Sequence, residues 1–226
     1  MVKVLTFLKR RPGMPVDEFQ AYWLRQHPTI VLRLPGVRRY VQSHTLASAY
    51  ARAEPVWDGI AEVWADDTDA LRTMSRGPEQ SAVQADEAMF IDRATMGLIV
   101  TEEHVVAAGA VGPDAVKAVE FLSRRPGTSV DDFQGHWRDR HGPILAGLPG
   151  LRRCVLSATR RAAYTAGRAP AYDGATLMWF DSPDALRAAA GSPAYAEAVA
   201  DRTHFLAPGA PPFIMTRQHV IVGGDP

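Results

Sequence analysis

The sequence contains the same segment twice. Residues 2–13 read VKVLTFLKRRPG and residues 116–127 read VKAVEFLSRRPG, so Gly13 returns as Gly127 at an offset of 114 positions. Further matches hold this register: Phe19, Trp23, His27, Pro35 and Gly36 return as Phe133, Trp137, His141, Pro149 and Gly150, and after one inserted residue Asp58-Gly59, Trp64 and His104 return as Asp173-Gly174, Trp179 and His219. A register kept over a hundred positions indicates a tandem duplication.

The duplication predicts two repeats joined by a short linker. The first repeat spans residues 1–106, the linker residues 107–115 and the second repeat residues 116–226. The linker is rich in small residues and lacks apolar periodicity, as connecting segments do. Because it is short, we expect the two repeats to lie side by side.

Each repeat has the element order β-α-β-β-α-β. In the first repeat we expect strands at 2–9, 37–45, 56–65 and 94–106, and helices at 15–27 and 69–90, the second broken at Gly77-Pro78. This order is that of a ferredoxin-like α+β unit, whose antiparallel sheet carries both helices on one face. The bare face needs a cover. We therefore expect the two repeats to form one intramolecular dimeric α+β barrel around a small-molecule pocket.

Charge and cysteine content exclude several classes of function. The chain has 25 basic and 25 acidic residues, so nothing favours binding to a nucleic acid or to an anionic membrane. The single cysteine, Cys154, can form neither an intramolecular disulfide nor a thiolate metal site. The chain starts on a predicted strand without a secretory signal pattern, and we expect a cytoplasmic protein.

The two repeats differ in the polarity of their second and third strands. Tyr40, Gln42 and His44 share one strand face by the period of two, whereas the second repeat has Cys154, Leu156 and Ala158 at those positions. Glu62 on the third strand is replaced by Leu177. This asymmetry predicts one working pocket, near His27, Tyr40, His44 and Glu62, with the second repeat as a structural wall.

Two kinds of candidate, the helix-terminal histidines and Glu62, have a structural alternative. His27 and His141 close the first helix of their repeats and could act as acid/base groups or satisfy the helix carbonyls. Glu62 could have a pKa raised by burial and transfer protons, or it could be solvated or paired with an arginine.

A further set is expected to contact a substrate, although its tryptophans are equally suited to the core. Its members are Trp23, Trp64, Gln42, His104, His141 and Trp137. A rim or core role fits His104 and His219 as well as a catalytic one. Asp58-Gly59 and its copy suit a structural turn at the entry of a strand.

Familiar cofactor and metal motifs are absent from the sequence. It has no glycine-rich phosphate loop, no nucleophile elbow and no His-Glu-x-x-His helix. His136 and His141 are five residues apart, which would place them on different helix faces and prevent them from sharing a metal. We expect no metal and no cofactor, while haem ligation by His27 or His141 stays open.

Three motifs resemble those of the EthD family. They are Phe19-x-x-x-Trp23-x-x-x-His27-Pro28, Leu34-Pro35-Gly36-Val37-x-x-Tyr40 and Asp58-Gly59-x-x-Glu62-x-Trp64, and the second repeat matches most of them. The resemblance covers nearly the whole chain, twice. It implies the dimeric α+β barrel fold and a superfamily with dehydratases, cofactor-free monooxygenases, lactone isomerases and haem enzymes. A fold alone does not choose among these.

The resemblance and the residues together suggest an enzyme with cofactor-free acid/base chemistry. Dehydration, cyclisation or isomerisation of an aromatic or polyketide-derived substrate would use His27 as acid/base. Tyr40 and His44 would orient an oxygen, and Glu62 would assist the histidine. The alternatives are a cofactor-free monooxygenase and a non-catalytic small-molecule-binding accessory protein. We expect a monomer with an internal pseudo-dimer, or a homodimer.

Overall fold

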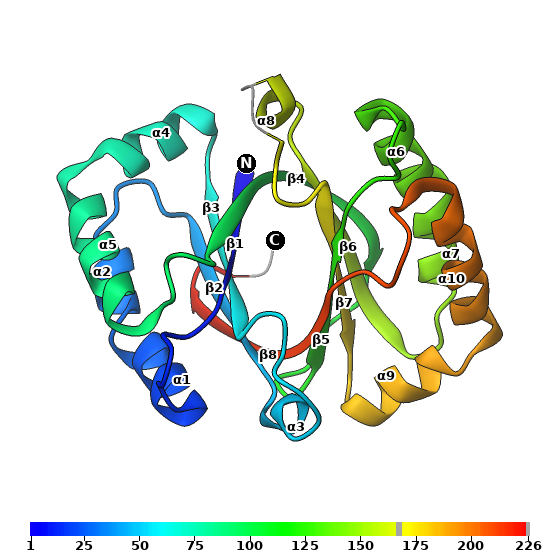
Figure 1. Ribbon diagram of the computed structural model, residues 1–226, viewed down its shortest axis with the longest axis horizontal. Helices are drawn as coiled ribbons and strands as arrows, with labels where there is room; N and C mark the ends of the chain where they lie inside the picture. The colour runs from blue at the N-terminus through cyan, green and yellow to red at the C-terminus, as the bar shows by residue number, and fades with distance from the viewer. Residues whose placement is uncertain (166–168, 225–226) are drawn as a thin grey trace. The chain divides into compact units, whose positions relative to one another are not determined.

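The computed structural model describes residues 1–165 and 169–224 (Figure 1). The first repeat contains β1 (Val2–Leu8), α1 (Val16–Arg25), α2 (Pro28–Val31), β2 (Arg39–Thr45), α3 (Ala47–Tyr50), β3 (Gly59–Ala65), α4 (Thr68–Arg76), α5 (Pro78–Phe90) and β4 (Gly97–Ala108). The second contains β5 (Val116–Leu122), α6 (Val130–His136), the π-helix η1 (Trp137–His141), α7 (Gly142–Ala146), β6 (Leu151–Thr159), α8 (Ala162–Thr165), β7 (Gly174–Phe180), α9 (Pro183–Ala190), α10 (Pro193–Phe205) and β8 (Phe213–Val222).

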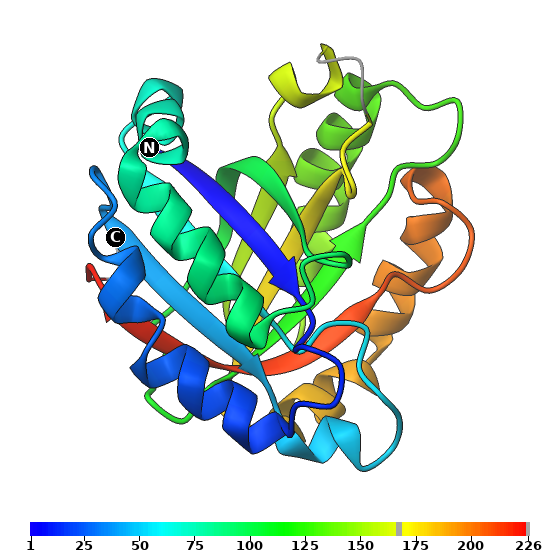
Figure 2. The ribbon, with the colours of Figure 1, turned by 60° about the vertical axis from the view of Figure 1, so that its left-hand side comes forward.

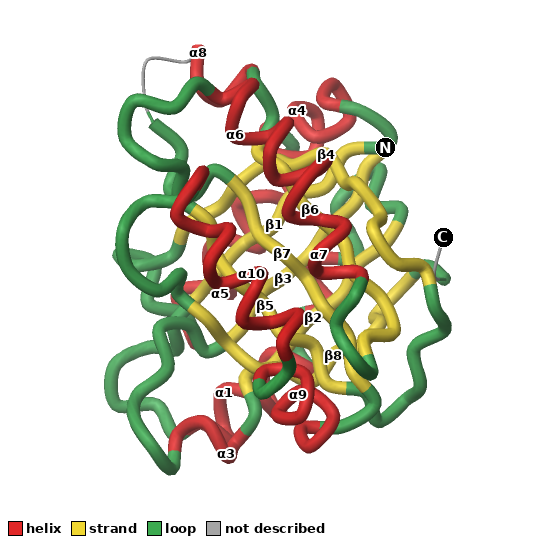
Figure 3. The backbone as a smooth tube through the Cα atoms, turned by 90° about the vertical axis from the view of Figure 1, so that its right-hand side faces the viewer, coloured by secondary structure: helices red, strands yellow, loops and turns green. Residues whose placement is uncertain are grey.

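Both repeats have the ferredoxin-like order that the sequence predicts. The second helical stretch is split where expected, because Gly77 adopts the extended conformation (φ −67°, ψ 157°) that precedes Pro78. Ser192 and Pro193 mark the same break in the second repeat, where the Ser192 hydroxyl accepts from the backbone N–H of Tyr195 and caps α10. In the second repeat, α7 and α10 pack against each other beside the strands (Figure 3).

The strands follow the order β1-β3-β2-β8-β5-β7-β6-β4 in a closed barrel. This confirms the predicted α+β barrel built from one polypeptide. Its pairing is antiparallel, with Leu5 opposite Glu62 in the first repeat and Val119 opposite Leu177 in the second.

The compact units of the chain are bounded differently from the sequence repeats. One unit comprises residues 1–100 and 218–226, and the other residues 101–217. The unit boundaries fall inside β4 and β8, so each of these strands contributes one end to each unit. β4 also continues to Ala108, into the segment expected to be the linker.

The two faces of the sheet in the first unit carry different side chains. Tyr40 pairs with Val63 and Gln42 with Ala61, so these residues share a face. Tyr40 packs there with Val31 of α2 and Val83 of α5, which identifies this as the helix-covered face (Figure 2). Further buried residues pack on the same face: Leu34, Met74, Ala65 and Val2.

The repeated Asp-Gly pair has the structural role that the sequence predicts. Asp58 is buried at the entry of β3 and accepts hydrogen bonds from the backbone N–H of Arg10 (2.7 Å) and the Tyr50 hydroxyl (2.5 Å). A Cβ on Gly59 would lie 2.5 Å from the ring of Trp23, so only glycine lets this indole reach the strand.

Among the residues that the structure describes, no helix is long and apolar enough to cross a membrane.

Candidate active site

A cavity of about 510 Å³ lies between the sheet of the first unit and its helices. Its wall is mainly apolar and includes Val4, Val31, Leu34, Val63, Met74 and Val83. Its polar groups include Thr6, His27, Tyr40, Gln84, Glu87 and Arg93. The volume falls in the range of small-molecule sites.

The expected pocket lay inside the barrel, whereas this cavity lies on the other face of the strands. The cavity lies on the helix-covered face because strand alternation sends short side chains there, such as Val4, Thr6 and Ala61. The other face of the same strands carries the longer side chains of Lys3, Leu5 and Phe7, all buried.

His27 stands at the cavity wall, held by Asp86 of α5. The Nδ1 atom of His27 lies 2.6 Å from Oδ2 of Asp86, and the Tyr22 hydroxyl donates to Oδ1 of the same carboxylate at 2.6 Å. The backbone N–H of His27 reaches back five residues to the carbonyl of Tyr22 at 3.3 Å, a π-type turn that puts both side chains on one side. His27 and Asp86 are both buried.

These surroundings suit His27 to act as a base. Burial lowers the pKa of His27 below its ordinary value, and the hydrogen bond and charge of Asp86 oppose that shift only in part. The imidazole is therefore neutral at pH 7. With Nδ1–H donated to Asp86, Nε2 carries the free electron pair.

Tyr40 lines the same cavity and is oriented by Gln42. The side-chain amide of Gln42 donates to the Tyr40 oxygen and to the carbonyl of Trp23, both at 2.8 Å. Since the Tyr40 oxygen accepts from Gln42, its own O–H can donate elsewhere. Burial raises the pKa of Tyr40 above its ordinary value, so the phenol stays protonated.

His44 lies behind this group and does not line the cavity. Its ring stacks on Trp23 with centroids 4.3 Å apart, and its Nε2 lies 3.0 Å from the Gln42 oxygen. Burial, with a smaller contribution from His219, lowers the pKa of His44 to about 3. His44 can thus position Gln42, and through it Tyr40, but cannot shuttle protons near pH 7.

Glu62, expected in one pocket with His27 and Tyr40, does not line this cavity. Glu62 lies on the opposite face of the sheet, where its carboxylate pairs with Lys3 Nζ at 3.0 Å, both groups fully buried. Trp64 is on that face too, 5.2 Å from Lys3 Nζ, and is absent from the cavity wall. The alternation of side chains along a strand shows which residues share a face with Glu62. It does not show which of the two faces borders a cavity, because that depends on where the helices leave space.

The second repeat has the same histidine–aspartate pair, but two residues that line the cavity in the first repeat are replaced in the second. His141 Nδ1 lies 2.8 Å from Asp201 Oδ2, as His27 does with Asp86. At the positions of Thr6 and Glu87, however, the second repeat has Glu120 and Arg202, which form a partly buried ion pair between sheet and helix.

Three of the residues that were expected to contact a substrate do not line the cavity. Trp137 and His141 are buried in the second unit, and His104 is exposed on β4. None of the three lines the cavity of the first unit.

Asp86, the partner of His27, was not predicted from the sequence. It corresponds to Asp201 in the repeat register, and this repetition is a signal that would have identified it. The prediction that His136 and His141 face different ways is wrong, because the turn between them is the π-helix η1. Residues five apart in a π-helix lie on one side, and both histidines contact Asp201.

Comparison with known proteins places the chain in a family. The profile of the EthD domain matches residues 11–94 and again residues 125–209. A search among proteins with curated descriptions found no match.

Several solved structures are similar to the chain at low sequence identity. An anthrone oxidase-like protein is 15% identical with a TM-score of 0.66, over 100% of this chain and 96% of that one. A candidate monooxygenase from Lactobacillus acidophilus NCFM is 9% identical with a TM-score of 0.58, over 99% and 96% of the two chains. An ethyl tert-butyl ether D family protein from Bacillus halodurans C-125 is 22% identical with a TM-score of 0.39, over 46% of this chain and 99% of that one.

The fold and the repeated motifs thus define a dimeric α+β barrel protein whose two halves are in one chain. The chain belongs to the EthD family, with two EthD domains in tandem.

Proposed function

We propose that the protein is an enzyme that moves a proton on a small aromatic or polyketide-derived carbonyl compound bound in the cavity of the first unit, without a cofactor. The observation that carries this proposal is the His27–Asp86 pair at the wall of an apolar cavity. A neutral imidazole fixed by a carboxylate, beside a phenol that can donate a hydrogen bond, is an acid/base pair suited to carbon acids.

The first step is removal of a proton from a carbon next to the carbonyl. Nε2 of His27 takes the proton, Asp86 stabilises the resulting imidazolium, and the Tyr40 hydroxyl donates to the carbonyl oxygen as it becomes an enolate. The C–H electron pair moves into the enolate, so no oxidant is needed. The apolar wall excludes water, which strengthens both interactions.

The fate of the proton distinguishes the reactions that this site could perform. Its return to a different carbon gives isomerisation, and its delivery to a departing β-hydroxyl gives dehydration with release of water. If the enolate attacks a second carbonyl of the same molecule, the proton passes to the new alkoxide and the product is a ring.

A second candidate is a cofactor-free monooxygenase. The fold likeness to an anthrone oxidase-like protein favours it, and the same deprotonation would start it. The electron-rich anion would react with O₂, one oxygen atom entering the carbon as a carbonyl and the other leaving as water.

Anthrone, an aromatic ketone with an acidic methylene group, is a suitable probe for both candidates. We would follow hydrogen–deuterium exchange at this methylene by NMR in D₂O under nitrogen, and oxygen uptake in air. We expect protein-dependent exchange that His27→Ala abolishes and that His141→Ala, the matched change in the second repeat, leaves intact.

Other results would discriminate against the proposal. Uptake of oxygen that depends on His27 would favour the monooxygenase. Binding of anthrone without exchange, or exchange that is equal in wild type and His27→Ala, would contradict the acid/base role and favour a binding protein without turnover.

A further inference from the structure

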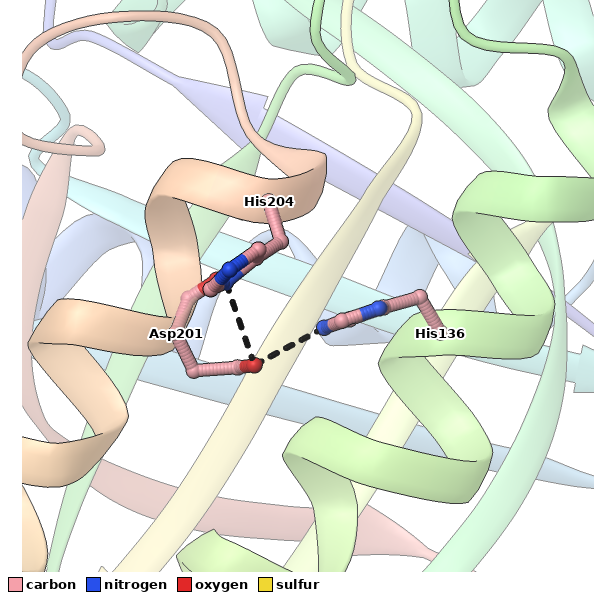
Figure 4. A group of neighbouring side chains, drawn as sticks. All are labelled: His136, Asp201 and His204. Atoms are coloured by element: carbon pink, nitrogen blue, oxygen red, sulfur yellow. Dashed lines mark hydrogen bonds and ion pairs between the residues drawn. The ribbon is translucent and has the colours of Figure 1, made fainter.

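Three side chains of the second repeat, from α6 and α10, point toward one another between the two helices (Figure 4). His136 Nε2 lies 2.9 Å from Asp201 Oδ1, and His204 Nδ1 lies 3.7 Å from the same oxygen. The three candidate ligand atoms all lie within 4.8 Å of one another. We propose that His136, Asp201 and His204 form a binding site for a divalent transition-metal ion.

The donor set determines the class of ion. Two imidazoles and one carboxylate suit Zn²⁺, Co²⁺, Ni²⁺ or Cu²⁺ rather than Mg²⁺ or Ca²⁺, which prefer oxygen ligands. Around a tetrahedral ion with bonds of about 2.1 Å the ligand atoms lie about 3.4 Å apart. The ligand atoms of the present cluster, which lie within 4.8 Å of one another, must move closer together, and His204 can supply this movement because its side chain is 68% exposed.

The surroundings of Asp201 are arranged as they are around metal-binding carboxylates. Its second oxygen, Oδ2, is held by Nδ1 of buried His141 at 2.8 Å, which fixes the orientation of the carboxylate, and His136 Nε2 lies 2.9 Å from Oδ1 and 3.1 Å from Oδ2. The π-helix η1 makes this possible by bringing His136 and His141 to the same aspartate.

The neighbouring cation does not oppose a metal ion at this position. Arg202 follows Asp201 in the sequence, but its guanidinium is turned inward to the carboxylate of Glu120. Its charge is therefore compensated away from the cluster.

The first repeat lacks these ligands and so provides the control. His136, Asp201 and His204 correspond to Tyr22, Asp86 and Met89. Tyr22 keeps the hydrogen bond to the aspartate at 2.6 Å but is no nitrogen ligand, and Met89 is exposed. The proposed ion would connect α6 with α10. None of its three ligands lines the cavity of the first unit, so the inference is independent of the proposed enzyme function.

The test is titration of the tag-free, full-length protein with ZnCl₂ by calorimetry, and with CoCl₂ followed by visible absorption. The variants are His136→Tyr and His204→Met, which install the residues of the first repeat, and His104→Ala, which removes an exposed histidine elsewhere. We expect one Zn²⁺ per chain, the ligand-field bands of Co²⁺, and no binding of MgCl₂.

Each ligand variant should weaken Zn²⁺ binding by about tenfold or more, since loss of even an outer partner costs that much. His104→Ala should bind as the wild type does. Absence of Zn²⁺ binding by the wild type, or equal binding by His204→Met, would overturn the proposal. Because His204 is exposed, its variant should fold even if His136→Tyr does not.

Discussion

Oδ2 of Asp86 lies 2.6 Å from Nδ1 of His27, although the two residues are 59 positions apart in the sequence. This contact joins the residue that precedes α2 to α5 and fixes which nitrogen of His27 is left free to act as the base. The equivalent contact between Asp201 and His141 shows that the pair comes from the fold of each repeat. The His27–Asp86 pair stands beside the cavity that Tyr40 also lines.

The first prediction concerns the pH dependence of activity. Because burial lowers the pKa of His27, the free base that the reaction needs predominates at neutral pH. We expect kcat/KM to rise with pH, with a midpoint below 6.5, and then to level off.

The Asp86→Asn variant tests whether the midpoint of the pH profile reflects the pKa of His27. Asp86 raises the pKa of His27 against the effect of burial, so its removal should move the midpoint to lower pH. The plateau should fall by about 100-fold or more, since His27 loses its orientation and the stabilisation of its imidazolium. A midpoint that rises in this variant would contradict the assignment. Rates of anthrone exchange across pH provide the measurement.

The second prediction concerns acid stability. The pKa of His44 is about 3 in the folded chain because the ring is buried, whereas in an unfolded chain it is about 6.5. Between these values the unfolded chain binds a proton that the native one does not. The free energy of unfolding should therefore fall as pH falls through this window, by up to about 1.4 kcal/mol per pH unit from this group.

His44→Phe keeps a flat ring against Trp23 and removes the titration. It should lower stability at pH 7, because Gln42 loses a partner, but make the slope with pH shallower. Urea unfolding at pH 7, 6 and 5 measures both. A slope equal to that of the wild type would show that other groups control acid stability.

The third prediction concerns a variant in which the ion pair of the second repeat is introduced into the cavity of the first. The double variant Thr6→Glu with Glu87→Arg reproduces Glu120 and Arg202 at the matching positions. We expect it to fold and to lose at least about tenfold in affinity for anthrone, because the added side chains would occupy the cavity. Quenching of tryptophan fluorescence reports binding, with Thr6→Ser as the control. Unchanged affinity would mean that the ligand binds elsewhere.

The fourth prediction separates stability from activity at Glu62. Glu62→Gln removes a charge that compensates Lys3, which is completely buried. We expect the free energy of unfolding to fall by about 3 kcal/mol, with anthrone exchange per folded molecule unchanged, because Glu62 is on the face away from the cavity. Urea unfolding and exchange rates on the same sample give both quantities. A loss of exchange without a loss of stability would restore Glu62 to the reaction.

The strands and helices were predictable because their signals are local. The split between α4 and α5 follows from Pro78, and the alternation of Tyr40, Gln42 and His44 follows from the geometry of any strand. The roles of these three residues were less predictable. Only Tyr40 reaches the cavity, since His44 is covered by the ring of Trp23.

The misplacement of Glu62 and the omission of Asp86 have a common physical cause. A strand has two faces, and its sequence tells which residues share a face but not which face borders empty space. That space depends on the summed volumes of side chains from α1, α2, α4, α5 and the sheet. Likewise, the π-helix η1 changed which histidines face Asp201 by altering the helical period at one turn.

The sequence alone established the duplication, the order of elements, the EthD motifs and the unequal polarity of the repeats, because each is a matter of spacing along the chain. It could not place the cavity on the helix-covered face, pair His27 with Asp86, or gather His136, Asp201 and His204. Those features arise where side chains distant in the chain meet, and the outcome of packing depends on all of them at once.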